Sequence, residues 1–100
     1  MFDKTIQVSG VTMTLRPYTE KRLKELNAIN EEISAWIDSN PDATIADVPL
    51  EKKAMWWRRK ADVLWAPERP IDIEFFKSEE FEASQLKESE SFFMKGRLYL

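Results

Sequence analysis

The sequence predicts an α+β fold that is predominantly helical, with a small N-terminal β-hairpin followed by about three helices. Apolar and polar residues alternate between residues 4 and 15, which is the period of a half-buried strand. Two later stretches, residues 19–39 and 48–65, repeat their apolar residues at steps of three and four, the period of one helix face, and a third, residues 78–95, carries a thinner apolar stripe. A chain of 100 residues has the size of a single domain, so we expect residues 1–100 to form one.

The hairpin is predicted over residues 4–15, around the turn signal Ser9–Gly10. Val11, Met13 and Leu15 alternate with two threonines and therefore share one face of the second strand. A lone hairpin is marginally stable in water, so this apolar face is expected to cover the core.

The predicted helices span three stretches: 19–39, 48–65 and 78–95. Thr19, Asp47 and Ser78 are the expected N-terminal caps, and Gly96 is the expected residue just after the last helix. Residues 71–75 alternate again, and two interpretations stay open for them. They form either a third short strand beside the hairpin or an extended segment that leads into the last helix.

The second helix carries more apolar surface than one core-facing stripe requires. Five of its residues fall on one face and are expected to pack into the core: Leu50, Ala54, Trp57, Ala61 and Leu64. Met55, Trp56 and Val63 fall beside that face, among Lys52, Arg59 and Lys60. Apolar surface beyond the needs of one small core predicts binding to another protein.

Four residues are predicted to contact this partner: Trp56, Arg59, Phe92 and Phe93. Tryptophan and arginine are enriched in binding hot spots, and Arg59 or Lys60 is expected to lie over the Trp56 ring. Consecutive phenylalanines cannot both face inward from one helix, so burial of one in the core is the alternative. The polar run at residues 89–91 predicts a weakly held middle of the last helix, and the apolar tail 97–100 is expected to pack into the core or a neighbour.

Composition excludes most kinds of catalytic site. The chain contains no cysteine and no histidine, which removes thiolate and imidazole chemistry, and its two glycines form no phosphate-binding loop. We therefore expect no enzyme activity, no cofactor and no metal, with a carboxylate-only magnesium or calcium site as the remaining alternative. The net charge of −3 argues against nucleic acid as a partner. The N-terminus lacks the pattern of a signal peptide, and no run is long enough to span a membrane, so a cytoplasmic protein is expected.

The charge is distributed unevenly along the chain. Residues 51–60 carry five bases and one acid, whereas residues 74–90 carry six acids and two bases. A surface polarised in this way fits a partner of mixed charge or association of the chain with itself. A homo-oligomer is therefore one of the expected states.

The N-terminal stretch from residue 6 to residue 26 resembles the start of tail assembly chaperones of long-tailed bacteriophages. The resemblance rests on a hairpin around Gly10, the element Leu15-Arg-Pro-Tyr-Thr19, and the amphipathic helix that follows. It implies a non-enzymatic, oligomer-prone protein of the infected host cell that binds the tape-measure protein and helps recruit tail tube subunits. Two alternatives are a structural subunit of the virion, in its neck, tail or baseplate, and a small regulator that binds a host protein.

Overall fold

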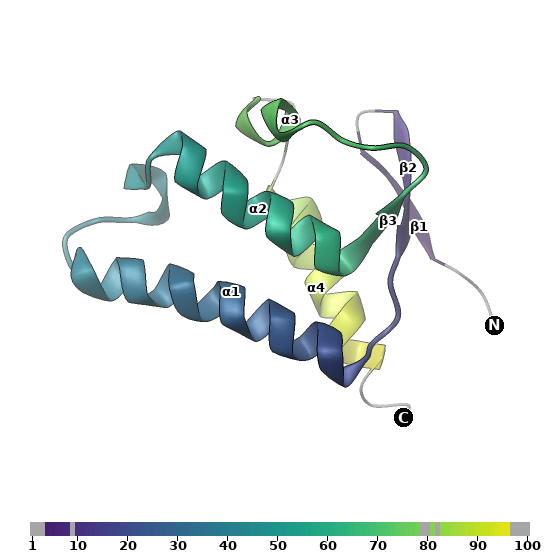
Figure 1. The fold of residues 1–100 in the computed structure, drawn as a ribbon, viewed down its shortest axis with the longest axis horizontal. Helices are drawn as coiled ribbons and strands as arrows, with labels where there is room; N and C mark the ends of the chain where they lie inside the picture. Colours follow the sequence, from purple (N-terminus) through teal and green to yellow (C-terminus); the bar gives the residue numbers. More distant parts are fainter. Residues whose placement is uncertain (1–3, 9, 79–80, 82, 97–100) are drawn as a thin grey trace.

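The computed structural model describes residues 4–8, 10–78, 81 and 83–96, and its fold is α+β and mostly helical, as predicted (Figure 1). The elements of these residues, in chain order, are β1 (Thr5–Val8), β2 (Val11–Leu15), α1 (Glu20–Ser39), the 3-10 turn η1 (Ile45–Asp47), α2 (Leu50–Leu64), β3 (Trp65–Pro67), α3 (Ile73–Lys77) and α4 (Ala83–Gly96). The molecule is flat and elongated, with extents of 45 × 30 × 17 Å. The sheet lies at one end, and the connection between α1 and α2 lies at the other (Figure 1).

The predicted hairpin is present, and it forms two strands of a three-stranded antiparallel sheet. Val8 pairs with Val11, so a two-residue connection joins β1 to β2; Ser9 of the predicted turn lies outside the described residues. Gly10 has a φ of +80°, a left-handed conformation that glycine adopts without strain. Met13 and Leu15 are buried, as their shared face predicts, and they hold the sheet against the helices.

The third strand lies earlier in the chain than residues 71–75. It is β3, which continues directly from α2 and pairs antiparallel with β2, placing Trp65 opposite Leu15. Residues 71–75 form neither of the two expected structures, because α3 begins at Ile73. The side chain of Asp72 accepts a hydrogen bond from the backbone N–H of Glu74, which caps this short helix. Five alternating residues are too few to distinguish a strand from a single capped helical turn.

Helix α1 begins and ends close to its predicted bounds. Pro17 ends the extended segment, and the Thr19 side chain accepts a hydrogen bond from the backbone N–H of Arg22 at 3.1 Å. Leu26 and Ile29 are buried, whereas the charged face of the helix is exposed. The cap therefore fixes where the chain turns from the sheet into the helix.

Replacing Thr19 with alanine is expected to destabilise the protein by about 1 kcal/mol, because the N–H of Arg22 loses its partner. Thr19→Ser is the matched control, since serine retains the hydroxyl and should leave stability within about 0.5 kcal/mol of the original. Urea denaturation followed by circular dichroism measures both changes. Equal losses for the two variants would show that the cap does not stabilise α1.

Helix α2 is the central element of the fold, since it packs against α1, α3, α4 and β3. Its buried residues are Ala54, Trp56, Lys60, Ala61, Val63 and Leu64, which cover about half of its circumference. The predicted stripe was therefore too narrow and partly misplaced. Trp56 and Val63 are buried, Trp57 is only half-buried, and Leu50 is exposed. A helix with packed neighbours on three sides needs a wider apolar arc than a helix that faces one core.

The start of the last helix differs from the prediction. Ser78 ends α3, because its backbone N–H donates to the carbonyl of Phe75, and α4 begins at Ala83. Phe81 lies between these helices and contacts the rings of Phe75 and Phe76 with centroid distances of 5.7 and 5.1 Å. This aromatic cluster, rather than a longer helix, connects the C-terminal third to α2. Residues 79, 80 and 82 of the predicted helix, and the tail 97–100, lie outside the described residues.

The middle of α4 is held to the other helices by polar contacts, contrary to the weak packing that residues 89–91 suggest. The Trp65 indole N–H donates to Ser89 Oγ at 2.7 Å, and that hydroxyl donates to the carbonyl of Gln85. Lys60 Nζ lies 3.3 Å from Glu90 Oε2, and Asn30 Nδ2 donates to the other oxygen of Glu90. These contacts join α1, α2 and β3 to α4. Polar side chains can be buried without a penalty where each has a hydrogen-bond partner.

Candidate partner-binding surface

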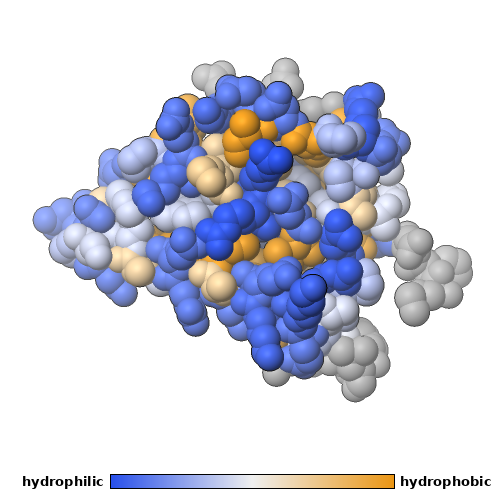
Figure 2. Space-filling model, in the orientation of Figure 1, coloured by the Kyte–Doolittle hydropathy of each residue, from blue (hydrophilic) through white to orange (hydrophobic). Residues whose placement is uncertain are grey.

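The exposed side of α2 points away from its three neighbouring helices. Helical spacing and exposure place six residues on this side: Glu51, Lys52, Met55, Arg58, Arg59 and Asp62. We call these six residues the outer face of α2. Figure 2 shows the molecule in the view in which α2 lies in front of α4, and small hydrophobic areas are visible there among charged side chains.

Met55 is the apolar centre of the outer face, with 59% of its surface exposed, the largest fraction among the exposed large hydrophobic residues of the described chain. Bases lie three residues before it and three and four residues after it, and the acid Glu51 lies four residues before it. Methionine is flexible and polarizable, and it adapts to irregular partner surfaces. An exposed methionine among charged residues therefore has the composition of a protein contact.

The charged residues of the outer face differ in how firmly they are held. Arg59 forms an ion pair with Glu32 of α1, and Lys52 Nζ lies 5.6 Å from the ring centroid of Trp56. Arg58 forms no ion pair or hydrogen bond with the part of the chain that the structure describes. None of the five N–H donors of Arg58 is therefore used by the described residues.

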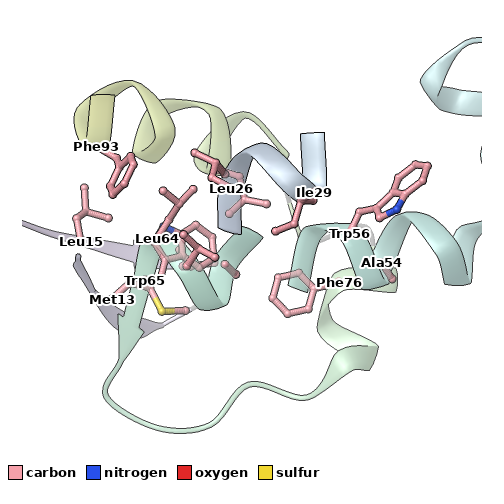
Figure 3. Close-up of a cluster of buried hydrophobic side chains, with 14 of the residues drawn as sticks. Met13, Leu15, Leu26, Ile29, Ala54, Trp56, Leu64, Trp65, Phe76 and Phe93 are labelled. Atoms are coloured by element: carbon pink, nitrogen blue, oxygen red, sulfur yellow. The ribbon is translucent and has the colours of Figure 1, made fainter. Parts of the chain in front are cut away.

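Two of the four predicted contact residues belong to the core. Trp56 is 4% exposed and Phe93 is 1% exposed, so neither presents its ring to a partner in this structure. Figure 3 shows Phe93 near Leu15, on the sheet side of the buried cluster, and Trp56 at the opposite side near Ala54. The expected base over the Trp56 ring is Lys52, not Arg59 or Lys60.

The other two predicted residues, Arg59 and Phe92, reach the surface on different elements. Arg59 is exposed on α2 and contacts α1, whereas Phe92 is half-buried on α4 with Lys4 Nζ 4.9 Å from its ring centroid. The structure does not show these two residues in contact with each other or in one cluster. Arg59 alone remains part of the outer face.

Sequence reasoning missed Met55, Arg58 and Asp62 as surface candidates. Met55 lies beside the predicted apolar stripe, but residue type favours the adjacent Trp56 as the contact residue. The pair Arg58 and Asp62 has the spacing of one helical turn, and that spacing was the available signal. The position of the buried side of α2 determines which of its residues remain exposed. This position depends on three neighbouring helices.

A second group of exposed apolar residues lies at the end of the molecule where α1 leads into α2 (Figure 1). Ile37, Ile45 and Leu50 are 37%, 40% and 52% exposed, and they belong to α1, η1 and the first turn of α2. Asp47 caps η1 and not α2, because its carboxylate accepts a hydrogen bond from the backbone N–H of Thr44 at 2.8 Å. These residues add exposed apolar surface at that end of the molecule.

Comparison with known proteins found no match to a protein-family model, to a curated protein or to a solved structure. Among the helices that the structure describes, none is long and apolar enough to cross a membrane. The described carboxylates form no group of three or more that could hold a metal ion. The fold and its surface thus define an α+β, mostly helical domain with an exposed, basic and partly apolar helix face.

Proposed function

We propose that this chain is a non-enzymatic protein-binding domain that acts as a bacteriophage tail assembly chaperone. In this role it binds the tape-measure protein in the host cytoplasm and helps recruit tail tube subunits. The observation that carries the proposal is the outer face of α2, where Met55 is exposed and three bases outnumber two acids. Such a face suits a helical partner whose apolar stripe is bordered by acidic residues.

The N-terminal third supports the same proposal. The hairpin around Gly10, the break at Pro17 and the cap at Thr19 are the elements on which the resemblance to tail assembly chaperones rests. These elements support the central helix through β2, which pairs with the strand that follows α2 directly. The resembling segment thus positions α2 but does not itself form the proposed surface.

The mechanism is the reversible covering of apolar surface. A long helical tape-measure protein exposes apolar stripes until tube subunits surround it, and such stripes promote aggregation. Met55 supplies apolar contact, while Arg58 and Arg59 supply charge that steers an acidic partner and sets its orientation. Contacts that remain partly hydrated dissociate readily, which allows tube subunits to replace the chaperone.

Met55→Glu is expected to weaken binding of the tape-measure protein at least tenfold, because a carboxylate replaces the apolar centre of the outer face. Met94→Glu is the matched control: Met94 is 37% exposed on α4, away from that face, and the same change there should leave affinity within about twofold. Co-expression with the tape-measure protein, followed by calorimetric titration, measures both affinities. A wild-type chain that neither binds the tape-measure protein nor keeps it soluble would overturn the proposal.

The composition of finished particles separates a chaperone from a structural subunit of the virion. A chaperone leaves the tail when tube subunits polymerise, so mass spectrometry should detect the chain in infected cells and not in purified particles. A stoichiometric amount of the chain in those particles would identify it as a structural subunit instead.

A further inference from the structure

A small hollow lies between α2, the sheet and the segment that leads to α3. Apolar side chains form most of its wall: Met13, Ala61, Trp65, Pro70, Ile71 and Phe76. Arg58 and Asp62, both exposed members of the outer face, lie at its edge. The hollow is therefore continuous with the surface proposed to bind the tape-measure protein.

The volume of the hollow, about 170 Å³, limits what it can hold. Sites for drug-sized ligands are larger, roughly 300–1,000 Å³. An apolar cavity of about 150 Å³ binds benzene, so the hollow has room for one phenyl ring or one branched aliphatic side chain. A single side chain of a bound protein fits this space, whereas a cofactor does not.

The edge of the hollow carries one charge of each sign. Arg58 and Asp62 are four residues apart on α2, about 6 Å along its axis, and neither forms an ion pair with the described residues. Since both charges are exposed, they add little to affinity. They favour one charge order in the partner, that is, one sequence order of its acidic and basic residues. The matching segment has an acid on the Arg58 side of its apolar residue and a base on the Asp62 side.

We infer that the hollow is an anchor pocket for one apolar side chain of the partner protein, with an acidic and a basic neighbour paired to Arg58 and Asp62. This inference rests on the proposed function, because it specifies which feature of the partner that surface recognises. Hot-spot residues commonly fill such desolvated pockets beside charged rims. The occupant is a protein segment and not a free small molecule, because no buried side-chain polar atom of the described residues lacks a hydrogen-bond partner and could orient one.

Titration with capped peptides, followed by NMR, tests the pocket. One peptide has a phenylalanine preceded by aspartate and followed by lysine, the second has these charges exchanged, and the third has alanine in place of phenylalanine. The indole N–H of Trp65 and the methyl groups of Ile71 report on the wall. We expect saturable shifts with phenylalanine peptides only, and about threefold tighter binding of one charge order.

The double variant Arg58→Glu/Asp62→Arg should exchange the preferred charge order, because it exchanges the two rim charges and alters no buried residue. An unchanged melting temperature confirms that this variant folds. Absence of shifts at the wall, equal shifts with the alanine peptide, or an order preference unaffected by the variant would each overturn the inference. If the intact chain does not bind the tape-measure protein while the peptides behave as expected, the proposed function fails and the pocket stands. If the intact chain binds the tape-measure protein but the peptides do not behave as expected, the proposed function is retained and the pocket is rejected.

Discussion

Replacing Trp65 with alanine is expected to destabilise the protein by about 3–5 kcal/mol, the range for removing a large buried aromatic side chain. Trp65 is 1% exposed and joins the end of α2 to the sheet, opposite Leu15. Its indole N–H donates to Ser89 Oγ, which is itself buried on α4. Domains of this size have a total stability of about 5–15 kcal/mol, so the variant should be largely unfolded at mildly elevated temperature.

Trp65→Phe separates packing from hydrogen bonding. Phenylalanine retains most of the buried ring, and Ser89 keeps its bond to the carbonyl of Gln85, so a loss of about 1–2 kcal/mol is expected. Urea denaturation of both variants gives the two free energies. A loss below about 1 kcal/mol for Trp65→Ala would show that this side chain is not the junction between sheet and helices.

Trp56→Ala is expected to cost about 3–4 kcal/mol of stability, whereas Trp57→Ala should cost about 1 kcal/mol. The two residues are adjacent and chemically identical, but Trp56 is 4% exposed and Trp57 is only half-buried. The pair is thus a matched test of which side of α2 faces the core. Thermal denaturation followed by circular dichroism measures the difference.

Equal losses for the two tryptophans, or a larger loss for Trp57→Ala, would contradict the position of the buried side of α2. The same result would return Trp56 to the surface and restore it as a partner contact. Quenching of tryptophan fluorescence by acrylamide gives an independent check, because Trp57 should be quenched more strongly than Trp56.

Local signals predicted the elements that depend on short-range chemistry. The hairpin follows from alternation around Gly10, and the start of α1 follows from Pro17 and the Thr19 cap. The end of α2 follows from the prolines after it, at positions 67 and 70. Each of these features involves residues close in sequence, so a single chain contains the information to predict it.

Features that depend on tertiary neighbours could not be predicted in the same way. The third strand is three residues long, and it exists because β2 offers an edge to the chain as it leaves α2. Ser89 interrupts the apolar pattern of α4, yet it is buried because Trp65 provides a donor from β3. Trp56 is buried on α2, which packs against α1, α3 and α4. Sequence periodicity assumes a narrow buried stripe, whereas the buried arc of α2 covers about half of its circumference.

In the candidate site, too, some features were predictable from the sequence and others depend on tertiary packing. Arg59 was predicted and lies on the outer face of α2, but Phe93 fills the core beside Tyr18, with ring centroids 5.2 Å apart. Phe92 reaches the surface on another element, near Lys4. Residue type indicated which side chains favour partner contact, whereas the packing around α2 determined which of them are accessible.

NMR of the chain labelled with ¹³C at its methionine methyl groups, during titration with the tape-measure protein, tests the central claim most directly. The chain has four methionines, and three lie in the described residues: Met13 in the pocket wall, Met55 on the outer face and Met94 on α4. Binding through the outer face predicts that the Met55 resonance shifts or broadens while that of Met94 stays unchanged. A shift of Met94 with no change at Met55 would contradict the account.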